Sequence, residues 1–291
     1  MARIAIVGGG SIGEALLSGL LRAGRQVKDL VVAEKMPDRA RYLAETYSVL
    51  VTSVRDAVEN ATFVIIAVKP SDVPSVVAEI SKLTAESGND VPDQVLITVA
   101  AGVTTAFLES KLTAGTPVVR VMPNAPALVG AGISAMAKGR FATNEQLKEV
   151  AALFDSVGAV LTVPEEHLDA VTAVSGSGPA YFFLMIEALV DAAVGVGLSR
   201  SVSTELVAQT IAGSAAMLLD RMEQDRGAPG EAASDLSLDT TAARLRAIVT
   251  SPGGTTAAAL RELEGHGLRA AVNEAVRAAK TRSEQLRITS E

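Results

Sequence analysis

Short apolar runs alternate with amphipathic stretches through the first half of the 291-residue chain. Each apolar run is short enough to form one buried strand, and each stretch between two runs has helical spacing. This alternation predicts an α/β domain built on a doubly wound parallel sheet. The predicted strands are residues 3–7, 30–33, 63–68, 95–99, 118–122, 129–137 and 159–163, with a helix at 144–156 between the last two.

Beyond about Glu165 the strand pattern stops and helical spacing takes over. We therefore expect an all-α domain after the α/β domain, and we place the two domains at residues 1–163 and 164–291. A stretch at 224–239, rich in Gly, Ala, Ser and acidic residues, is predicted to form a mobile loop. The predicted helices are residues 168–173, 180–195, 199–219, 241–249, 256–263 and 268–286.

The helix predicted at 180–195 is apolar around most of its circumference. Its length approaches the ~20 residues that span a bilayer, but Glu187 and Asp191 lie inside it, and charges are costly in lipid. A helix buried in protein is therefore favoured over a membrane span. Since a domain rich in Ala and Leu buries little area per residue, we predict that this helix packs against a second copy in an obligate homo-oligomer.

Composition narrows the classes of function. The net charge is −7 and the Lys and Arg residues are scattered, so binding to nucleic acid is not expected. The chain has no Cys and two His residues, which leaves no familiar Cys- or His-based metal site, and we expect no metal. The chain enters a predicted strand by Arg3, so we expect no signal peptide and a cytoplasmic location.

Gly8, Gly10 and Gly13 form a G-x-G-x-x-G motif between the first predicted strand and a helical pattern. The first glycine allows a sharp turn, the second allows the backbone to approach a pyrophosphate, and the third lets the helix pack closely on the strand. The helix start at Ser11 and Ile12 adds free N–H groups and a partial positive charge for the same anion. This context favours a bound dinucleotide over a bare turn.

The end of the second predicted strand bears on the choice of dinucleotide. A carboxylate is expected there, about 20 residues past the glycines, to bind the adenosine ribose. Glu34 occupies this place and favours NADH. Lys35, and Arg39 one turn later, are cations that would instead meet the 2′-phosphate of NADPH, whereas Arg41 is more simply a solvated side chain. The sequence leaves NADPH and NADH both open.

Other turns follow predicted strands at the sheet edge where ligands bind in such folds. Pro70 favours extended backbone at Lys69, and Val68, Lys69 and Pro70 are expected to border the cofactor, although an ordinary turn fits the same pattern. Small residues in two equivalent turns would leave room for a nicotinamide ring. The candidates there are Ala101, within 100–102, and Asn124, within 122–124.

The segment 251–256 reads Ser-Pro-Gly-Gly-Thr-Thr and leads directly into a predicted helix. Two glycines before a helix leave several backbone N–H groups free, which makes a nest for a small anion such as a carboxylate. Capping of the helix by Thr255 or Thr256 is the simpler interpretation, and it is compatible with anion binding.

The segment 175–179, Ser-Gly-Ser-Gly-Pro, precedes the apolar helix. It is not the nucleophile elbow of a hydrolase, because Pro179 stands where the last glycine of that motif belongs. Tight helix packing is its simplest role. His167 lies between acidic and apolar neighbours and His266 lies between two glycines, so we expect a surface residue and a turn residue, without catalytic roles.

These motifs resemble those of the pyrroline-5-carboxylate reductase family, and the resemblance spans nearly the whole chain. The blocks 168–181 and 251–256 are highly specific to that family, whereas the glycine motif is shared with many dehydrogenases. The resemblance implies a Rossmann-type dinucleotide-binding domain, here 1–163, and an all-α dimerisation and substrate domain, here 164–291. It also implies NADPH- or NADH-dependent reduction of 1-pyrroline-5-carboxylate, a cyclic imine, to L-proline, the last step of proline biosynthesis.

The same resemblance implies homodimers that often assemble into rings, with the active site shared between protomers. Thr256 would be the catalytic hydroxyl near the imine nitrogen, and backbone N–H groups of Gly254, Thr255 and Thr256 would hold the substrate carboxylate. The segment 224–239 is longer than the family usually has, and Glu34 stands where many members carry a small or polar residue. The expected substrate-binding residues are Ser251, Gly253, Gly254, Thr255, Thr256 and Ser177, and the expected cofactor-binding residues are Gly8, Gly10, Ser11, Ile12, Gly13, Glu34, Lys35, Val68, Lys69, Pro70, Ala101 and Asn124.

Three other classes fit less well. A β-hydroxyacid dehydrogenase needs a lysine in its helical domain, but this chain has none between Lys148 and Lys280. A ketol-acid reductoisomerase needs carboxylates on facing helices, whereas Glu187 and Asp191 are one turn apart on one helix. A sensor that binds the nucleotide without turnover would need no second anion site at 251–256.

Overall fold

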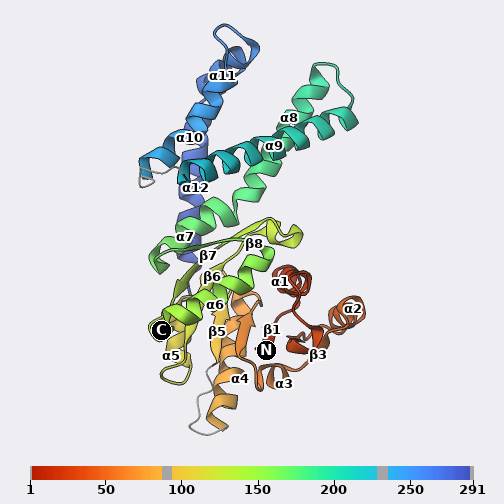
Figure 1. Ribbon diagram of the computed structural model, residues 1–291, viewed down its shortest axis with the longest axis vertical. Helices are drawn as coiled ribbons and strands as arrows, with labels where there is room; N and C mark the ends of the chain where they lie inside the picture. The colour runs from red at the N-terminus through yellow and green to blue at the C-terminus, as the bar shows by residue number, and fades with distance from the viewer. Residues whose placement is uncertain (1, 87–93, 228–234, 289–291) are drawn as a thin grey trace. The chain divides into compact units, whose positions relative to one another are not determined.

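The computed structural model describes residues 2–86, 94–227 and 235–288 (Figure 1). Contacts between Cα atoms divide the chain into two compact units, which we describe separately. The first unit is Met1–Pro179 together with Val276–Glu291, and the second is Ala180–Ala275.

The first unit is built on an eight-stranded sheet with the order β3-β2-β1-β4-β5-β6-β7-β8 (Figure 1). All neighbouring strands are parallel except β6 and β7, which are antiparallel. The strands are β1 Ile4–Val7, β2 Leu30–Ala33, β3 Leu50–Thr52, β4 Phe63–Ile66, β5 Val95–Thr98, β6 Val118–Met122, β7 Gly132–Lys138 and β8 Gly158–Thr162.

The structure corrects the prediction of an all-parallel sheet at β7. Between β6 and β7 the chain forms the short 3-10 helix η3, Ala125–Val129, which ends at Gly130 with a φ of 74°. So short a connection cannot cross over the sheet, and the following strand must return antiparallel. The same helix occupies the start of the strand predicted at 129–137. The edge strand β3 was missed because it has three residues, too few to show a period of two.

The central strands of the sheet are buried on both faces, as apolar strands of this kind require, whereas the edge strands β3 and β8 are partly exposed. In β1, Ile4 and Ile6 pack into one apolar cluster, while Ala5 and Val7 pack into a second cluster on the opposite face. Helices α1, α2 and α6 contribute to the first cluster, and α3, α4 and α5 contribute to the second. The helices of this sheet are α1 Ser11–Arg22, α2 Pro37–Tyr47, α3 Val54–Val58, α4 Val73–Glu86, α5 Thr105–Lys111 and α6 Asn144–Phe154, with 3-10 turns η1 Val27–Asp29, η2 Pro70–Asp72 and η4 Asp155–Val157.

Two segments from outside the predicted α/β domain also belong to the first compact unit. One contains η5 Glu165–His167, α7 Leu168–Val171 and the π-helical turn η6 Thr172–Gly176, and the other is the end of α12, Leu268–Gln285. Arg120 of β6 pairs with the first segment, and Asp169 of that segment binds the second. The domain boundary at 163/164 stays a prediction.

The second unit is helical. Its helices are α8 Gly178–Gly195, α9 Arg200–Gly227, α10 Asp235–Ile248, α11 Thr255–Gly265 and the beginning of α12.

The loop predicted at 224–239 is wrong at both ends, because α9 continues to Gly227 and α10 begins at Asp235. The ion pair of Arg221 with Asp225, at 3.3 Å, supports the last turns of α9. The buried Thr241 of α10 donates a hydrogen bond to the same Asp225 carboxylate at 3.2 Å. Residues 228–234 lie outside the described part of the chain.

The apolar helix α8 is not buried within a single chain. Phe182 and Phe183 are 62% and 64% exposed, and among the apolar side chains of α8 only Val190 is buried. Two helical stretches, Glu165–Gly195 and Arg200–Asp225, are long and apolar enough to cross a membrane by length and composition, and little of either is buried inside the chain. Such a surface needs a cover that one copy of the chain does not supply.

Candidate cofactor and substrate sites

The glycine motif forms the turn between β1 and α1, and each glycine has a different geometric reason. Gly8 has a φ of 106°, and a Cβ there would lie 2.7 Å from the Ala67 carbonyl oxygen. A Cβ on Gly13 would lie 2.0 Å from the Gly8 carbonyl oxygen, so the helix approaches the strand closely. Around Gly10, by contrast, no atom lies within 4 Å of the Cβ position. The turn is therefore closed at Gly8 and Gly13 and open to a ligand at Gly10.

Gly10 is the N-cap of α1, and no side chain caps this helix. The first N–H groups of the helix, which include those of Ser11 and Ile12, have no carbonyl partner within the helix. Together with the partial positive charge of the helix start, they suit a bound phosphate group. Both residues thus lie where the motif places them.

A cavity of about 630 Å³ opens beside this turn, at the carboxyl ends of β1, β2 and β4. It brings together the predicted cofactor residues Gly8, Gly10, Glu34, Lys35, Val68 and Lys69. Other residues of its wall are Met36, Thr52, Ser53, Asp72, Ser75 and Glu79. The other predicted cofactor residues do not belong to this wall: they are Ser11, Ile12, Gly13, Pro70, Ala101 and Asn124.

The Glu34 carboxylate is fixed by two backbone N–H groups. Gly9 donates to one of its oxygens at 2.9 Å, and Met36 donates to the other at 2.8 Å. The neighbouring Lys35 ammonium lies 3.1 Å from the Asp72 carboxylate, across the cavity wall. Glu34 therefore links the glycine turn to the start of α2 and faces the cavity as a carboxylate.

Arg39 of α2 binds the glycine turn from its other side. Its Nε donates to the Gly9 carbonyl oxygen at 2.6 Å, and its guanidinium pairs with Glu14 in the first turn of α1. Tyr47 and Tyr42 donate to the same carboxylate at 2.8 and 3.1 Å. This cluster neutralises the one acidic side chain in the first turn of α1, so the positive end of that helix remains available to an anion.

The pKa values of this cluster follow from the same contacts. Burial acts to raise the pKa of Glu14, but the hydrogen bonds from Arg39, Tyr47 and Tyr42 outweigh it and hold that pKa below its ordinary value. Burial and the hydrogen bond to Glu14 raise the pKa of Tyr47 to about 12. Sequence reasoning missed Glu14, Tyr42 and Tyr47, because they are brought together only when α2 packs on α1.

The turn after β4 has the predicted extended form. Lys69 has φ and ψ values of −60° and 147°, and Pro70 begins the 3-10 helix η2. Ala67 donates to the Val7 carbonyl at 2.7 Å, which holds this turn against the end of β1. The extended conformation predicted before the proline is confirmed.

The turns after β5 and β6 are occupied by other parts of the chain. Gly102, with a φ of 75°, accepts a hydrogen bond from the Ile288 N–H at 2.9 Å. The Asn124 amide donates to the Ser175 carbonyl at 3.3 Å and accepts from the Ile133 N–H at 2.9 Å. Both ends of the Asn124 amide are thus used within the chain, and contact of Asn124 or Ala101 with a cofactor stays a prediction.

The segment 175–179 packs tightly at Gly176, as predicted, but at Gly178 nothing lies within 4 Å of the Cβ position. A Cβ on Gly176 would lie 3.0 Å from the Met122 Cε atom. Ser175 donates its hydroxyl to the Val171 carbonyl at 3.0 Å, and the Ser177 N–H donates to the Thr172 carbonyl at 2.8 Å. The Ser175 hydroxyl is thus used inside the helical turn.

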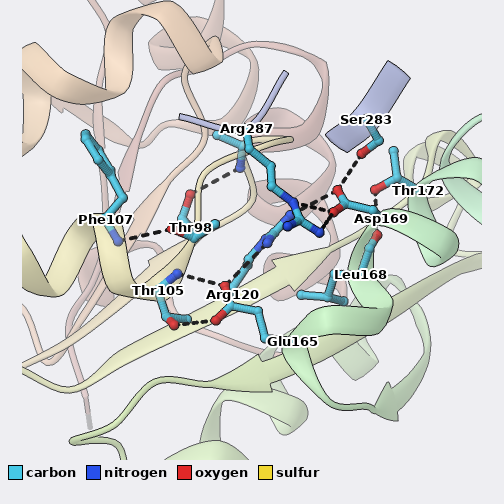
Figure 2. Close-up of polar contacts among 12 residues, drawn as sticks. Thr98, Thr105, Phe107, Arg120, Glu165, Leu168, Asp169, Thr172, Ser283 and Arg287 are labelled. Carbon is cyan, nitrogen blue, oxygen red and sulfur yellow. Dashed lines mark hydrogen bonds and ion pairs between the residues drawn. The ribbon is translucent and has the colours of Figure 1, made fainter. Parts of the chain in front are cut away.

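A buried polar network holds the segment after β8 and the chain end on β6 (Figure 2). Arg120 of β6 lies 3.3 Å from the Glu165 carboxylate and 4.0 Å from that of Asp169. Asp169 accepts a 2.7 Å hydrogen bond from Ser283 and pairs with Arg287. No sequence pattern indicated this network, because its members come from three distant parts of the chain.

The segment 251–256 forms a turn and the start of α11. Gly253 has a φ of 70°, and the Gly254 N–H donates to the Ser251 carbonyl at 3.0 Å. Gly254 is the N-cap, and no side chain caps the helix, so the interpretation of Thr255 or Thr256 as the cap is wrong. The Gly254 N–H is used inside the turn, whereas those of Thr255 and Thr256 open the helix and point out of its start. These two N–H groups are the better candidates for a carboxylate.

Within the described residues, no three His, Asp or Glu side chains are grouped so that they could hold a metal ion. His266 ends α11, with its ring Nδ1 atom 2.8 Å from the Glu262 carbonyl oxygen. His167 is an exposed residue 4.0 Å from Glu166. Both histidines are helix-end residues.

The nucleotide site has a glycine turn open to phosphate, a cavity at the carboxyl ends of the strands and a fixed carboxylate beside it. Such a site, in a chain with an appended helical unit, is typical of a nicotinamide-nucleotide-dependent oxidoreductase. Residues 3–102 match the family model "NADP oxidoreductase coenzyme F420-dependent", and residues 165–286 match "Pyrroline-5-carboxylate reductase dimerisation". The chain belongs to the pyrroline-5-carboxylate reductase family.

Similarity to known members extends over the full length. The chain is 74% identical to the pyrroline-5-carboxylate reductase of Mycobacterium tuberculosis, over 100% of this chain and 99% of that protein. A solved pyrroline-5-carboxylate reductase from Coxiella burnetii superposes with a TM-score of 0.86 at 31% identity, over 99% of each chain. A Plasmodium falciparum pyrroline carboxylate reductase, solved with NADP bound, gives a TM-score of 0.80 at 28% identity, over 98% of each chain.

Proposed function

We propose that this protein reduces 1-pyrroline-5-carboxylate to L-proline with NADPH or NADH, the last step of proline biosynthesis. The observation that supports it most strongly is the full-length identity of 74% to a reductase of that name. The open approach at Gly10, beside a cavity of the size a nucleotide needs, supports the same conclusion from the structure.

The residues present fit the dinucleotide. The N–H groups at the start of α1 would hold its pyrophosphate, with Gly10 allowing close approach. Glu34, Val68 and Lys69 would border the adenosine side in the cavity. When bound, the reduced nicotinamide supplies the hydride.

The residues of the chain act on the substrate mainly by positioning it. A cyclic imine is basic enough to be protonated near neutral pH, and the resulting iminium accepts hydride with little further acid catalysis. We propose that the N–H groups of Thr255 and Thr256 hold the substrate carboxylate and that the Thr256 hydroxyl orients the ring nitrogen. Ser251, Gly253, Gly254 and Ser177 would complete the substrate site. This arrangement needs no His, Cys or Lys as an acid–base catalyst.

We also propose how the chain assembles and where in the cell it is located. Belonging to this family and matching its dimerisation model, the chain forms a homo-oligomer through residues 165–286, which include the exposed apolar face of α8. We propose that two protomers share each active site, that dimers assemble further into a ring, and that the apolar helices pack in this assembly rather than in a membrane. A cytoplasmic location is part of the same proposal.

The decisive assay follows nicotinamide absorbance with the purified full-length chain. Oxidation of NADH or NADPH that requires 1-pyrroline-5-carboxylate and yields proline is the expected result. A 2-oxo acid or a β-oxo acid in place of the imine, in parallel reactions, serves as the control. Turnover of one of these without turnover of the imine would refute the proposed function.

A further inference from the structure

Glu34 is held where it can discriminate between the two forms of the nucleotide. Its oxygens accept N–H groups of Gly9 and Met36 at 2.9 and 2.8 Å, and the residue lines the cavity. Gly9 permits this approach, because a Cβ there would lie 3.1 Å from the carboxylate and 2.4 Å from the Leu43 Cδ1 atom. A carboxylate offers about four acceptor positions, so two N–H donors leave room for hydroxyl donors.

The two cations that follow β2, Lys35 and Arg39, are already paired with carboxylates, whereas Lys69, the other lysine of the wall, follows β4. The Lys35 ammonium lies 3.1 Å from Asp72, and the Arg39 guanidinium is bound to Glu14 and to the Gly9 carbonyl oxygen. A 2′-phosphate at this place would have to break such pairs to gain a cation of its own.

The charged residues of the cavity wall also disfavour a 2′-phosphate. Its charged residues are three carboxylates and two lysines, so the wall does not attract a second anionic group. A phosphate ester placed beside the fixed Glu34 carboxylate would face a like charge in a partly buried site, where screening by water is weakest. Ribose hydroxyls, by contrast, donate hydrogen bonds to that carboxylate without any charge penalty.

We propose that Glu34 makes this chain prefer NADH over NADPH, by accepting the hydroxyls of the adenosine ribose and repelling a 2′-phosphate. This inference rests on the proposed function, since it concerns the nucleotide site of that reaction. NADP is bound in the Plasmodium falciparum relative, so the preference is one that this chain's own residues set and not a rule for the family.

Direct binding tests the proposal without the reaction. Dissociation constants of NADH and NADPH are measured with the full-length protein, from the change in nucleotide fluorescence on titration. We expect the wild-type chain to bind NADH about tenfold or more tightly than NADPH, since one close pair of like charges in a partly buried site is worth at least that factor. Glu34→Gln and Glu34→Ser should bring the ratio of the two constants close to one, mainly by tightening NADPH.

Glu45→Gln is the matched control, because Glu45 is an exposed residue of α2 outside the cavity wall and the variant has the same change of charge. It should keep the wild-type ratio. Equal or tighter binding of NADPH by the wild-type chain would overturn the inference, as would an unchanged ratio in both Glu34 variants with NADH still bound. Binding of neither nucleotide by the wild-type chain would refute the proposed function itself, and this inference with it. If a Glu34 variant fails to fold, the ratio of the NADH and NADPH dissociation constants of the wild-type chain still tests the preference.

Discussion

Ser283 and Asp169, 114 positions apart in the chain, are joined by a buried hydrogen bond of 2.7 Å (Figure 2). Asp169 is 1% exposed, and Arg120, 4.0 Å away, is 3% exposed. Arg287 pairs with the same carboxylate from the end of the chain. The Asp169 side chain thus connects β6, α7 and the segment that follows α12.

Replacing Asp169 should destabilise the first unit strongly. Asp169→Ala removes a carboxylate that Ser283 and two arginines share. Because Glu165 still pairs with the buried Arg120 at 3.3 Å, the cost should lie below the figure of about 3–5 kcal/mol for an uncompensated buried charge. Ser283→Ala removes one neutral donor and should cost about 1 kcal/mol. Denaturant unfolding at fixed protein concentration measures both, with the exposed Glu166→Gln as a control that should leave stability unchanged. Equal stability of Asp169→Ala and the wild-type chain would show that the network contributes nothing.

The same carboxylate should make stability depend on pH. Burial acts to raise the pKa of Asp169, but the hydrogen bonds from Ser283 and Arg287 and the charges of Arg287 and Arg120 outweigh it, and the pKa lies below its ordinary value. The unfolded chain therefore binds this proton first as pH falls. The stabilisation is complete above the unfolded pKa of about 3.9 and is lost as pH falls through the lower folded pKa.

Melting temperatures between pH 3 and 7 test this dependence, with the pH range set around that unfolded pKa. The wild-type curve should fall steeply at its acid end, and Asp169→Asn should show a lower and flatter curve. Parallel curves for the two proteins would mean that other carboxylates govern the acid transition.

Gly10→Ala should lower nucleotide affinity alone, whereas Gly13→Ala should also lower stability. Gly10→Ala places a methyl group in open space at an extended φ of −67°, so the fold should be preserved while nucleotide affinity falls by about tenfold or more. Gly13→Ala places a methyl group 2.0 Å from the Gly8 carbonyl, so the melting temperature should fall as well. Calorimetric melting and nucleotide titration separate the two effects. A Gly10→Ala variant with wild-type affinity would show that the ligand does not approach there.

The Thr256 hydroxyl is the proposed catalytic group. Thr256→Ala should lower kcat by roughly one to three orders of magnitude, the range for losing a positioning contact or a proton donor. Thr256→Ser keeps a hydroxyl and should retain most of the activity. Steady-state kinetics with saturating nucleotide compare the three proteins. Wild-type kcat in Thr256→Ala would assign the role to another group.

The exposed apolar face of α8 should hold the oligomer together. Phe183→Asp puts a charge on a side chain that is 64% exposed in the single chain, so the folded protomer should tolerate it while the interface does not. Sedimentation velocity should show dissociation toward monomers, together with loss of activity. Val129→Asp, 78% exposed in η3, is the control and should remain assembled. An unchanged assembly in Phe183→Asp would place the interface elsewhere.

The sequence predicted most of the elements correctly where local rules govern them. The glycine turn was predictable because Gly8 and Gly13 occupy backbone positions that no side chain fits. The extended backbone at Lys69 followed from the proline after it. The strands of the sheet centre were predictable because both of their faces are buried, which makes them continuous apolar runs.

Three features were missed for a common reason. The direction of β7 depends on the short η3 connection, and the continuation of α9 to Gly227 depends on the partner helix α10. The capping of α11 by Gly254, and not by a threonine, depends on the turn hydrogen bond to Ser251. Each outcome is decided by a contact rather than by the composition of the segment itself.

The order of residues along the chain thus determined a nucleotide fold followed by helices, because turns, strands and helices follow from neighbours a few positions apart. Only the tertiary structure decided what Glu34 binds, which groups neutralise Glu14, and how Asp169 joins the chain end to β6. Most of those contacts join residues 25 to 118 positions apart, and the spacing of residue types along the chain does not indicate such a pairing.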